Sequence, residues 1–352
     1  MDGPIDGSNE TGDVLVVTPV SSLTPGVGNN MPQEDFVAEH REIGATFGVV
    51  YSRSSNSIFA AAYNKRHTAF GPSGTGAIYK VDLEGDEFTV PVENEGVSTF
   101  VDLNALFGAN TAGEDPHPSS RGEAFFNRDS AAYDAVGQIG LGGFAISESG
   151  GELWTINLAD RKLYQIPMGG TPDNPQPPAA VGDITVWPAS GDLTGLPGLT
   201  GTASDIRPFG VKCYRDEVYI GLVNSAESTV VFDLDAYEVS NTGTQSLLRG
   251  FVYKLNPTSG MFTQVLSFPL DYTRGQAIDF CSNNAQAEFF PWAPLYDSDV
   301  FEAAVMGTSN NSLSGNPERA YPQPMLTDIE FTEDGKMILG IRDRFADQHG
   351  FR

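Results

Sequence analysis

The sequence predicts an all-β protein, a β-propeller built from four-stranded antiparallel blades. Two observations favour this fold: a strand–turn–strand pattern recurs along the chain, and glycine and proline are abundant. The 352 residues include 39 glycines and 23 prolines, about 18% together against an average of about 12%. Charged residues are only 19% of the chain, fewer than helical domains usually carry on their solvent faces. This composition is typical of many short strands joined by turns.

The strand–turn–strand pattern occurs four times. Its copies span residues 47–63, 143–157, 209–223 and 327–341. In each copy two apolar segments flank a short polar turn that contains Gly, Asp, Asn or Ser. These residues tolerate positive φ or hydrogen-bond to their own backbone, so they suit tight turns. Each copy is therefore predicted to form a β-hairpin.

A second pattern of alternating strand, turn and strand follows the first at residues 76–89 and 250–263, with a shorter version at 161–167. Joined to the preceding hairpin, it makes a unit of four antiparallel strands, and repeated units of this kind are propeller blades. A sandwich or jelly roll would not repeat a four-strand signature. At ~50 residues per blade we expect about six to seven blades with long loops between them, although only four begin clearly.

The predicted domain organisation is an N-terminal segment, residues 1–40, followed by the propeller over residues 41–352. The last hairpin is followed by only a few residues before Arg352. A ring must close, because an open edge strand invites aggregation. Either an apolar strand at residues 13–18 closes the last blade, or the propeller is truncated at its C-terminus.

Net charge excludes several classes of partner. With 46 acidic and 20 basic residues the chain carries a formal charge of -26, which repels phosphate backbones and anionic lipid. We therefore expect neither nucleic-acid binding nor membrane insertion, and no apolar run approaches the ~20 residues of a membrane span. The polar, acidic start of the chain does not resemble a signal peptide. An acidic, lysine-poor surface nevertheless suits an extracellular or cell-surface protein.

The two cysteines, Cys213 and Cys281, fit no metal-ligand spacing. In a secreted chain they either form a disulfide or remain two buried thiols. The four histidines form no zinc-ligand spacing, and no nucleophile elbow or phosphate-binding loop is present. His67 is expected to be a polar loop residue. Trp292 lies in an aromatic stretch that is either a stacking platform or a loop packed against the sheets.

Several motifs taken in order resemble the propeller region of large secreted or surface-anchored bacterial proteins, which often carry serine-aspartate-repeat B-like (Cna-B-like) domains. The motifs are Ile43–Tyr51, Lys65–His67, Phe70–Tyr79, Gly140–Phe144, Asn157–Tyr164, Arg207–Val211, Leu326–Phe331 and Met337–Phe345. The resemblance covers most of the chain and implies an extracellular scaffold or adhesin. It implies no catalytic residues, and the family pattern continues past Phe345 into further strands.

Two acidic clusters are candidate calcium sites, because calcium binds six to eight oxygen atoms in loops. They comprise Asp233, Asp235 and Glu238, and Asp297, Asp299 and Glu302. Neither matches the EF-hand spacing, and each could equally be a solvated acidic loop. Calcium is thus the one cofactor for which the sequence offers ligands.

A second candidate site is the mouth of the central channel, where propeller ligands gather. The residues expected there are Arg121, Glu123, Asp205, Arg207 and Asp328. Axial carboxylates around one metal would indicate a calcium-dependent hydrolase of the lactonase type. Here acids alternate with arginines, which favours ion pairing inside the channel.

Three functions follow from these observations. The first is a non-enzymatic extracellular propeller, a structural, adhesive or ligand-binding module whose partners are other extracellular proteins or glycans. The second is a calcium-dependent, lactonase-like hydrolase acting at the central channel. The third is a self-associating filament subunit whose incomplete last blade receives a strand from a neighbouring chain.

Overall fold

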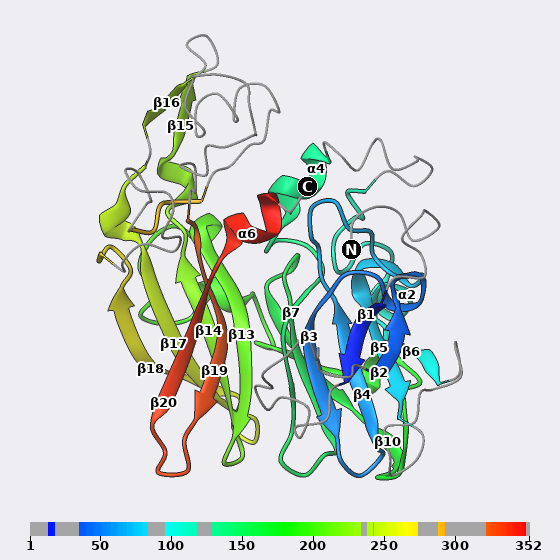
Figure 1. Ribbon diagram of the computed structural model, residues 1–352. Helices are drawn as coiled ribbons and strands as arrows, with labels where there is room; N and C mark the ends of the chain where they lie inside the picture. Colours follow the sequence, from blue (N-terminus) through cyan, green and yellow to red (C-terminus); the bar gives the residue numbers. More distant parts are fainter. Residues whose placement is uncertain are drawn as a thin grey trace, which may run out of the picture.

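The computed structural model describes residues 13–17, 35–83, 96–117, 129–233, 238–241, 243–273, 288–292 and 322–349. Within these ranges the protein is nearly all β (Figure 1). Three four-stranded antiparallel sheets follow one another along the chain, and a two-stranded sheet follows the third. The expectation of an all-β protein with four-stranded antiparallel units is confirmed. The number of blades and the closure of a ring stay predictions.

Each four-stranded sheet takes its strands in chain order. The first sheet contains β3 (Thr46–Ser52), β4 (Ser57–Ala62), β5 (Ala77–Asp82) and β6 (Val97–Asp102). The second contains β7 (Leu141–Ile146), β8 (Glu152–Asn157), β9 (Lys162–Pro167) and β12 (Thr185–Trp187). The third contains β13 (Ile206–Tyr214), β14 (Glu217–Asn224), β17 (Arg249–Asn256) and β18 (Met261–Pro269). The fourth contains β19 (Pro324–Phe331) and β20 (Met337–Asp343).

The four hairpins predicted from the repeated pattern are β3–β4, β7–β8, β13–β14 and β19–β20. The β13–β14 turn illustrates why the pattern identifies them. Tyr214 pairs with Glu217, which leaves Arg215 and Asp216 as a two-residue turn with φ of 51° and 59°. Positive φ at both positions is the geometry of a type I′ turn, which matches the twist of the flanking strands.

The remaining elements are small. They are the strand pairs β1 (Asp13–Val17) with β2 (Asp35–Glu39), β10 (Gly169–Thr171) with β11 (Asn174–Gln176) and β15 (Val231–Asp233) with β16 (Glu238–Asn241), and the helices α1 (His40–Ile43), α2 (Leu103–Phe107), α4 (Ser130–Ala135) and α6 (Arg344–His349).

The N-terminal strand does not pair with the last sheet. β1 pairs with β2 in a two-stranded sheet, and Leu15 packs against the apolar cluster that covers β4 and β5. The short separation in sequence between β1 and β2 makes this local pairing accessible. The structure therefore differs from the expected closing strand at residues 13–18. One edge of β1 is thus paired within its own chain, and the filament hypothesis, which needs this strand as a donor, stays a prediction.

The first strands of the four sheets, β3, β7, β13 and β19, are called the inner strands. β3 lies beside β7, β7 beside β13 and β13 beside β19, and the other strands extend outwards from them (Figure 1). Every inner strand is interrupted by a β-bulge or irregularity at the same place in its hairpin, between Thr46 and Val49, Leu141 and Phe144, Pro208 and Gly210, and Leu326 and Asp328. Repetition at one place indicates a structural role rather than a defect.

Glycine at this irregularity lets neighbouring sheets approach closely. A Cβ atom at Gly48 would lie 2.4 Å from the Cβ of Phe144, and one at Gly143 would lie 2.6 Å from the carbonyl oxygen of Phe209. A Cβ at Gly210 would lie 3.0 Å from the carbonyl oxygen of Leu326. Only glycine fits where backbones come this close. Each of these glycines therefore allows the backbone of the next sheet to approach closely.

The apolar core lies between the sheets. One buried cluster joins the first and second sheets, and a larger one joins the second, third and fourth. Its largest members include Trp154, Tyr253 and Phe251, all 1% exposed or less. Among the described residues, no helix is long and apolar enough to cross a membrane.

If these glycines are needed for the close approach of neighbouring sheets, Gly143→Ala will destabilise the protein. The added methyl group would clash with backbone atoms of β13, which cannot rotate away as a side chain can. Overpacking of this kind costs about 1–3 kcal/mol. We expect the midpoint of thermal unfolding to fall by several degrees. The matched control is Gly182→Ala, whose Cβ would have no atom within 4 Å. Equal melting temperatures for both variants would contradict the role of Gly143 in the close approach of the sheets.

Candidate functional site

Three aromatic side chains from the first and third sheets contact one another beside the inner strands β3 and β13. Phe47 of β3, Tyr63 just after β4 and Phe209 of β13 contact one another. Their ring centroids are 5.4 Å apart for Phe47 and Tyr63, 5.0 Å for Phe47 and Phe209, and 5.6 Å for Tyr63 and Phe209. These tilted and edge-to-face arrangements are favourable aromatic geometries.

A carboxylate from α6 covers this aromatic group. Asp347 is buried, accepts a hydrogen bond of 3.4 Å from the hydroxyl of Tyr63 and forms an ion pair with Arg342. The guanidinium of Arg342 lies 5.2 Å from the ring centroid of Phe47, a cation–π contact. The backbone N–H of Arg66 donates to the carbonyl of Asp347 at 3.2 Å. Asp347 thus links the first and fourth sheets.

Burial shifts three pKa values in this group, which we call the axial cluster: Tyr63, Lys65, Arg342 and Asp347. Burial raises the pKa of Tyr63 well above its usual value, and the charge of Asp347 raises it further. Burial also raises the pKa of Asp347, although Arg342 and Lys65 oppose the shift. Burial lowers the pKa of Lys65. Such shifts occur at functional sites and also in structural ion-pair networks.

A second buried charge group continues from the axial cluster. The guanidinium of the fully buried Arg344 donates to the carbonyls of Val136 (2.8 Å) and Asp134 (2.9 Å) and to the side chain of Gln323 (2.7 Å). It also lies 4.3 Å from the ring centroid of Trp292. Arginine suits this place because its planar, weakly hydrated head can stack and donate several hydrogen bonds at once.

Trp292 is therefore packed inside the molecule and is not a stacking platform for a ligand. Its side chain is fully buried, its indole N–H donates to the carbonyl of Pro324 at 2.9 Å, and Arg207 lies on its ring at 5.4 Å. The neighbouring Phe289 is also buried. The alternative in which the aromatic loop packs against the sheets is confirmed for these two residues.

His117 forms a third buried charge group beside the loop after β4. Its Nδ1 lies 2.9 Å from Asp115 Oδ1, and its Nε2 lies 3.3 Å from Asp129 Oδ2 and 3.1 Å from the carbonyl oxygen of Lys65. Burial of the ring lowers its pKa, but the hydrogen bonds to both carboxylates outweigh burial and raise the pKa to about 9. Asp129 also accepts from the backbone N–H of His67 at 2.8 Å. His67 itself is buried, with φ of 70°.

The structure describes three of the five residues predicted at the channel mouth, and each of the three has different surroundings. Asp205 is buried before β13, where its carboxylate accepts hydrogen bonds from the hydroxyl of Thr202 (2.8 Å) and from the backbone N–H (2.9 Å) and hydroxyl (2.7 Å) of Ser228. Arg207 forms an ion pair with Glu227, as the alternation of acids and arginines suggested. Asp328 is exposed on β19, and the remaining two residues, Arg121 and Glu123, lie outside the described residues.

The predicted calcium ligands fall mostly outside the described residues: Asp235, Asp297, Asp299 and Glu302. Asp233 and Glu238 are paired across the β15–β16 hairpin. The described ranges contain no cluster of three or more acids, histidines or cysteines that could hold a metal. The calcium sites therefore stay predictions.

The predicted disulfide also stays a prediction, because Cys281 lies outside the described residues. Cys213 is a half-buried thiol on β13, and burial raises its pKa to about 12. A thiol with so high a pKa is a weak nucleophile at neutral pH.

Sequence reasoning did not single out the axial cluster. Its members come from loops and strand ends more than 200 residues apart, and Tyr63 and Asp347 are 284 positions apart. One signal was present: Arg342, Asp343 and Arg344 follow directly on an apolar strand, where a charged run must be solvated or paired. The partners could not be identified without the topology.

No family model matches the chain. Colossin-D of Dictyostelium discoideum is 27% identical over 324 residues, which cover 90% of this chain and 27% of that protein. Colossin-A of the same organism is 25% identical over 361 residues, which cover 98% of this chain and 2% of that protein. The chain thus spans about a quarter or less of the length of these curated relatives.

Two solved structures show a distant likeness. The periplasmic gluconolactonase of Pseudomonas aeruginosa has a TM-score of 0.31 and 10% identity, over 71% of this chain and 47% of that one. A luciferin-regenerating enzyme has a TM-score of 0.30 and 11% identity, over 85% of this chain and 68% of that one. At these scores neither structure bears on the chemistry of this chain.

The position of His117 predicts a pH-dependent stability. Its pKa is about 9 when folded and about 6.5 when unfolded, so its stabilising contribution is complete below pH 6.5 and is lost as the pH rises to 9. The raised pKa corresponds to about 3 kcal/mol. Denaturant unfolding at pH 6 and pH 9.5 should show this loss in the natural protein and a clearly smaller one in His117→Gln. Parallel pH profiles for the two proteins would exclude the charged histidine as the cause.

Proposed function

We propose that this chain is a non-catalytic module of a longer extracellular protein, which acts by binding through its surface. The observation that carries the proposal is the mutual packing of aromatic side chains beside the inner strands, together with the pairing of the charged groups next to them. Phe47, Tyr63 and Phe209 pack on one another there, and Asp347 and Arg342 cover them.

The buried charges beside these side chains are paired within the chain. Asp347 pairs with Arg342, and Glu227 pairs with Arg207. A metal-assisted hydrolase needs carboxylates that leave coordination positions open for metal, water and substrate. Paired and hydrogen-bonded carboxylates instead hold neighbouring sheets together. The axial cluster therefore supports a structural role for these residues and leaves binding to the outer surface.

The relatives support the idea of a module. This chain matches colossins over nearly its whole length but spans only part of theirs. A strongly acidic coat, with a net charge of -26, keeps such a unit soluble and suppresses non-specific association. The resemblance to secreted and surface-anchored proteins noted from the motifs agrees with this role.

The competing hypothesis is the calcium-dependent, lactonase-like hydrolase, and an activity assay separates the two. We would measure hydrolysis of gluconolactone and of a second simple δ-lactone by the natural protein, with calcium chloride and with chelator. Because the carboxylate of Asp347 is already engaged by Tyr63 and Arg342, we expect hydrolysis at the rate of buffer alone under both conditions.

Calcium-dependent turnover that disappears in Asp347→Asn, with the fold retained by circular dichroism, would overturn the proposal. Asp173→Asn is the matched control, because this exposed carboxylate lies on the turn between β10 and β11. Turnover lost equally in both variants would indicate a contaminating enzyme rather than the axial cluster.

A further inference from the structure

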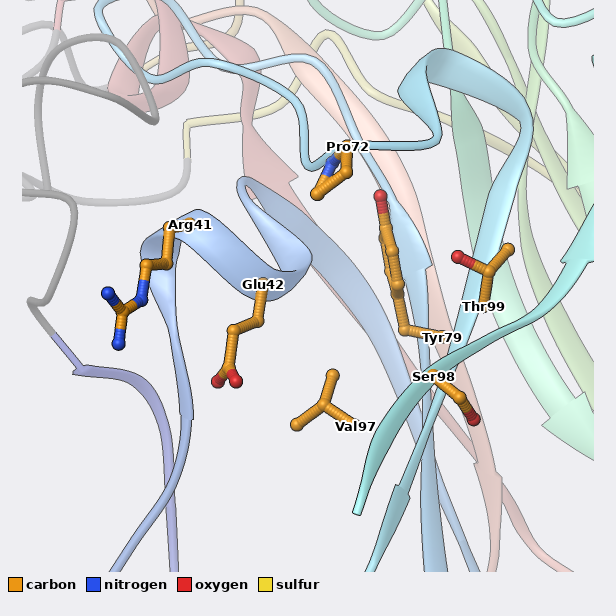
Figure 2. Close-up of a pocket in the computed structure, with 7 residues that line it drawn as sticks. All are labelled: Arg41, Glu42, Pro72, Tyr79, Val97, Ser98 and Thr99. Atoms are coloured by element: carbon orange, nitrogen blue, oxygen red, sulfur yellow. The ribbon is translucent and has the colours of Figure 1, made fainter. Parts of the chain in front are cut away.

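We propose that a cleft on the outer rim of the first sheet binds a neutral, polyhydroxylated ligand of the saccharide class. This inference rests on the proposed function of the chain as a binding module and names its ligand. The cleft lies between α1 and the strands β5 and β6 (Figure 2). Its volume is about 370 Å³, within the range of small-molecule sites.

The polar groups that line the cleft match a ligand rich in hydroxyl groups. Glu42 contributes a carboxylate, which accepts hydrogen bonds, and the exposed Ser98 and Thr99 contribute hydroxyls, which both donate and accept. Tyr79, only 1% exposed, forms part of the wall. Glu42 and Thr99 lie on either side of Tyr79 in the view of Figure 2. Pro72 adds an apolar surface that can cover the C–H face of a sugar ring.

The hydroxyls are held in place by the loop before β5. The backbone N–H of Ser73 donates to the hydroxyl oxygen of Tyr79 at 3.1 Å, and the Ser73 hydroxyl lies 2.8 Å from that of Thr99. A Cβ at Gly71 would lie 2.4 Å from the Tyr79 oxygen, so glycine is needed for this close approach. Positions fixed before a ligand arrives reduce the entropy lost on binding.

The carboxylate of Glu42 is also fixed. Its Oε2 accepts a hydrogen bond of 2.8 Å from the backbone N–H of Glu39 at the start of α1, an arrangement that belongs to a capping box. Glu39 in turn forms an ion pair of 2.6 Å with Arg41. The second oxygen of Glu42 can accept from a ligand hydroxyl without disturbing the helix start.

The same groups argue against other ligand classes. A phosphate would meet the carboxylate of Glu42, and the one guanidinium that lines the cleft, that of Arg41, is already ion-paired with Glu39 at 2.6 Å. A calcium ion takes six to eight oxygen ligands and favours several carboxylates, whereas this cleft offers one. An apolar ligand would cover the second oxygen of the Glu42 carboxylate and the hydroxyl of Ser98 without offering either a hydrogen bond, which is costly. A neutral polyol can satisfy the lining without these penalties.

The test is a titration of the full chain followed by ¹H–¹⁵N correlation spectra, with D-glucose, D-galactose, D-mannose and N-acetyl-D-glucosamine as probes. Inorganic phosphate and calcium chloride are titrated separately. We expect one or more sugars to bind with a Kd on the order of 1 mM, shifting the amide signals of residues 97–99 and 41–42.

Glu42→Gln and Thr99→Val should each weaken that binding at least fivefold, because the first replaces a charged acceptor oxygen by an amide donor and the second removes a hydroxyl. Thr263→Val on β18 of the third sheet is the matched control, since it removes an exposed strand hydroxyl far along the chain. Melting temperatures close to that of the natural protein would show that the variants are folded.

Saturable sugar binding that both cleft variants weaken and the control retains would support the proposal. No sugar binding, binding equal in all variants, or shifts at the cleft with phosphate or calcium alone would overturn it. The failure of this proposal is distinguishable from that of the proposed function, because only calcium-dependent lactone hydrolysis at the axial cluster overturns the latter.

Discussion

The close approach of the inner strands is the constraint on which the rest of the structure depends. At Gly143, a Cβ atom would lie 2.6 Å from both the carbonyl oxygen of Phe209 and the backbone nitrogen of Val211. The backbones of the second and third sheets are therefore in direct contact. The apolar clusters lie between the sheets, so this spacing also sets how their side chains pack. A small change in spacing would open voids throughout the core, and voids are costly.

Close approach leaves little room between the inner strands, and this explains the buried charges at one end. Polar groups excluded from water must find partners within the protein. Helix α6 supplies many of them: Asp347 reaches Tyr63 of the first sheet, and Arg344 reaches the carbonyls of Asp134 and Val136 before the second. A short helix thus connects three parts of the chain that the sheets alone would leave separate. Removing one partner of such a group would leave a buried charge uncompensated.

The fold was predictable where local chemistry decides it. Hairpins such as β13–β14 follow from two apolar segments and a turn whose residues accept positive φ. The candidate site was not, because its contacts depend on topology. Asp205 looks like a channel carboxylate in sequence, yet Ser228 of a distant turn binds it. The pairing of β1 with β2 was likewise missed, since an apolar strand carries no mark of its partner. The cleft residues gave no signal, because Tyr79 and Thr99 occupy ordinary strand positions.

The inner strand of the fourth sheet carries Asp328 where the inner strands of the other sheets carry a glycine that allows close approach, and this difference has a physical consequence. In the third sheet Gly210 pairs with Gly221, and Leu326 of the fourth sheet packs against this pair. At the same register of the fourth sheet, Asp328 pairs with Gly340, and Asp328 is exposed. A further sheet packed against this face of the fourth sheet would bury the Asp328 carboxylate, and without a cationic partner this burial would cost several kcal/mol. The outer face of the fourth sheet is therefore suited to solvent or to a cationic group. The fourth and first sheets instead contact each other through side chains, such as Arg342 packed on Phe47. Arg342 lies near the end of its strand, so this contact leaves Asp328 exposed.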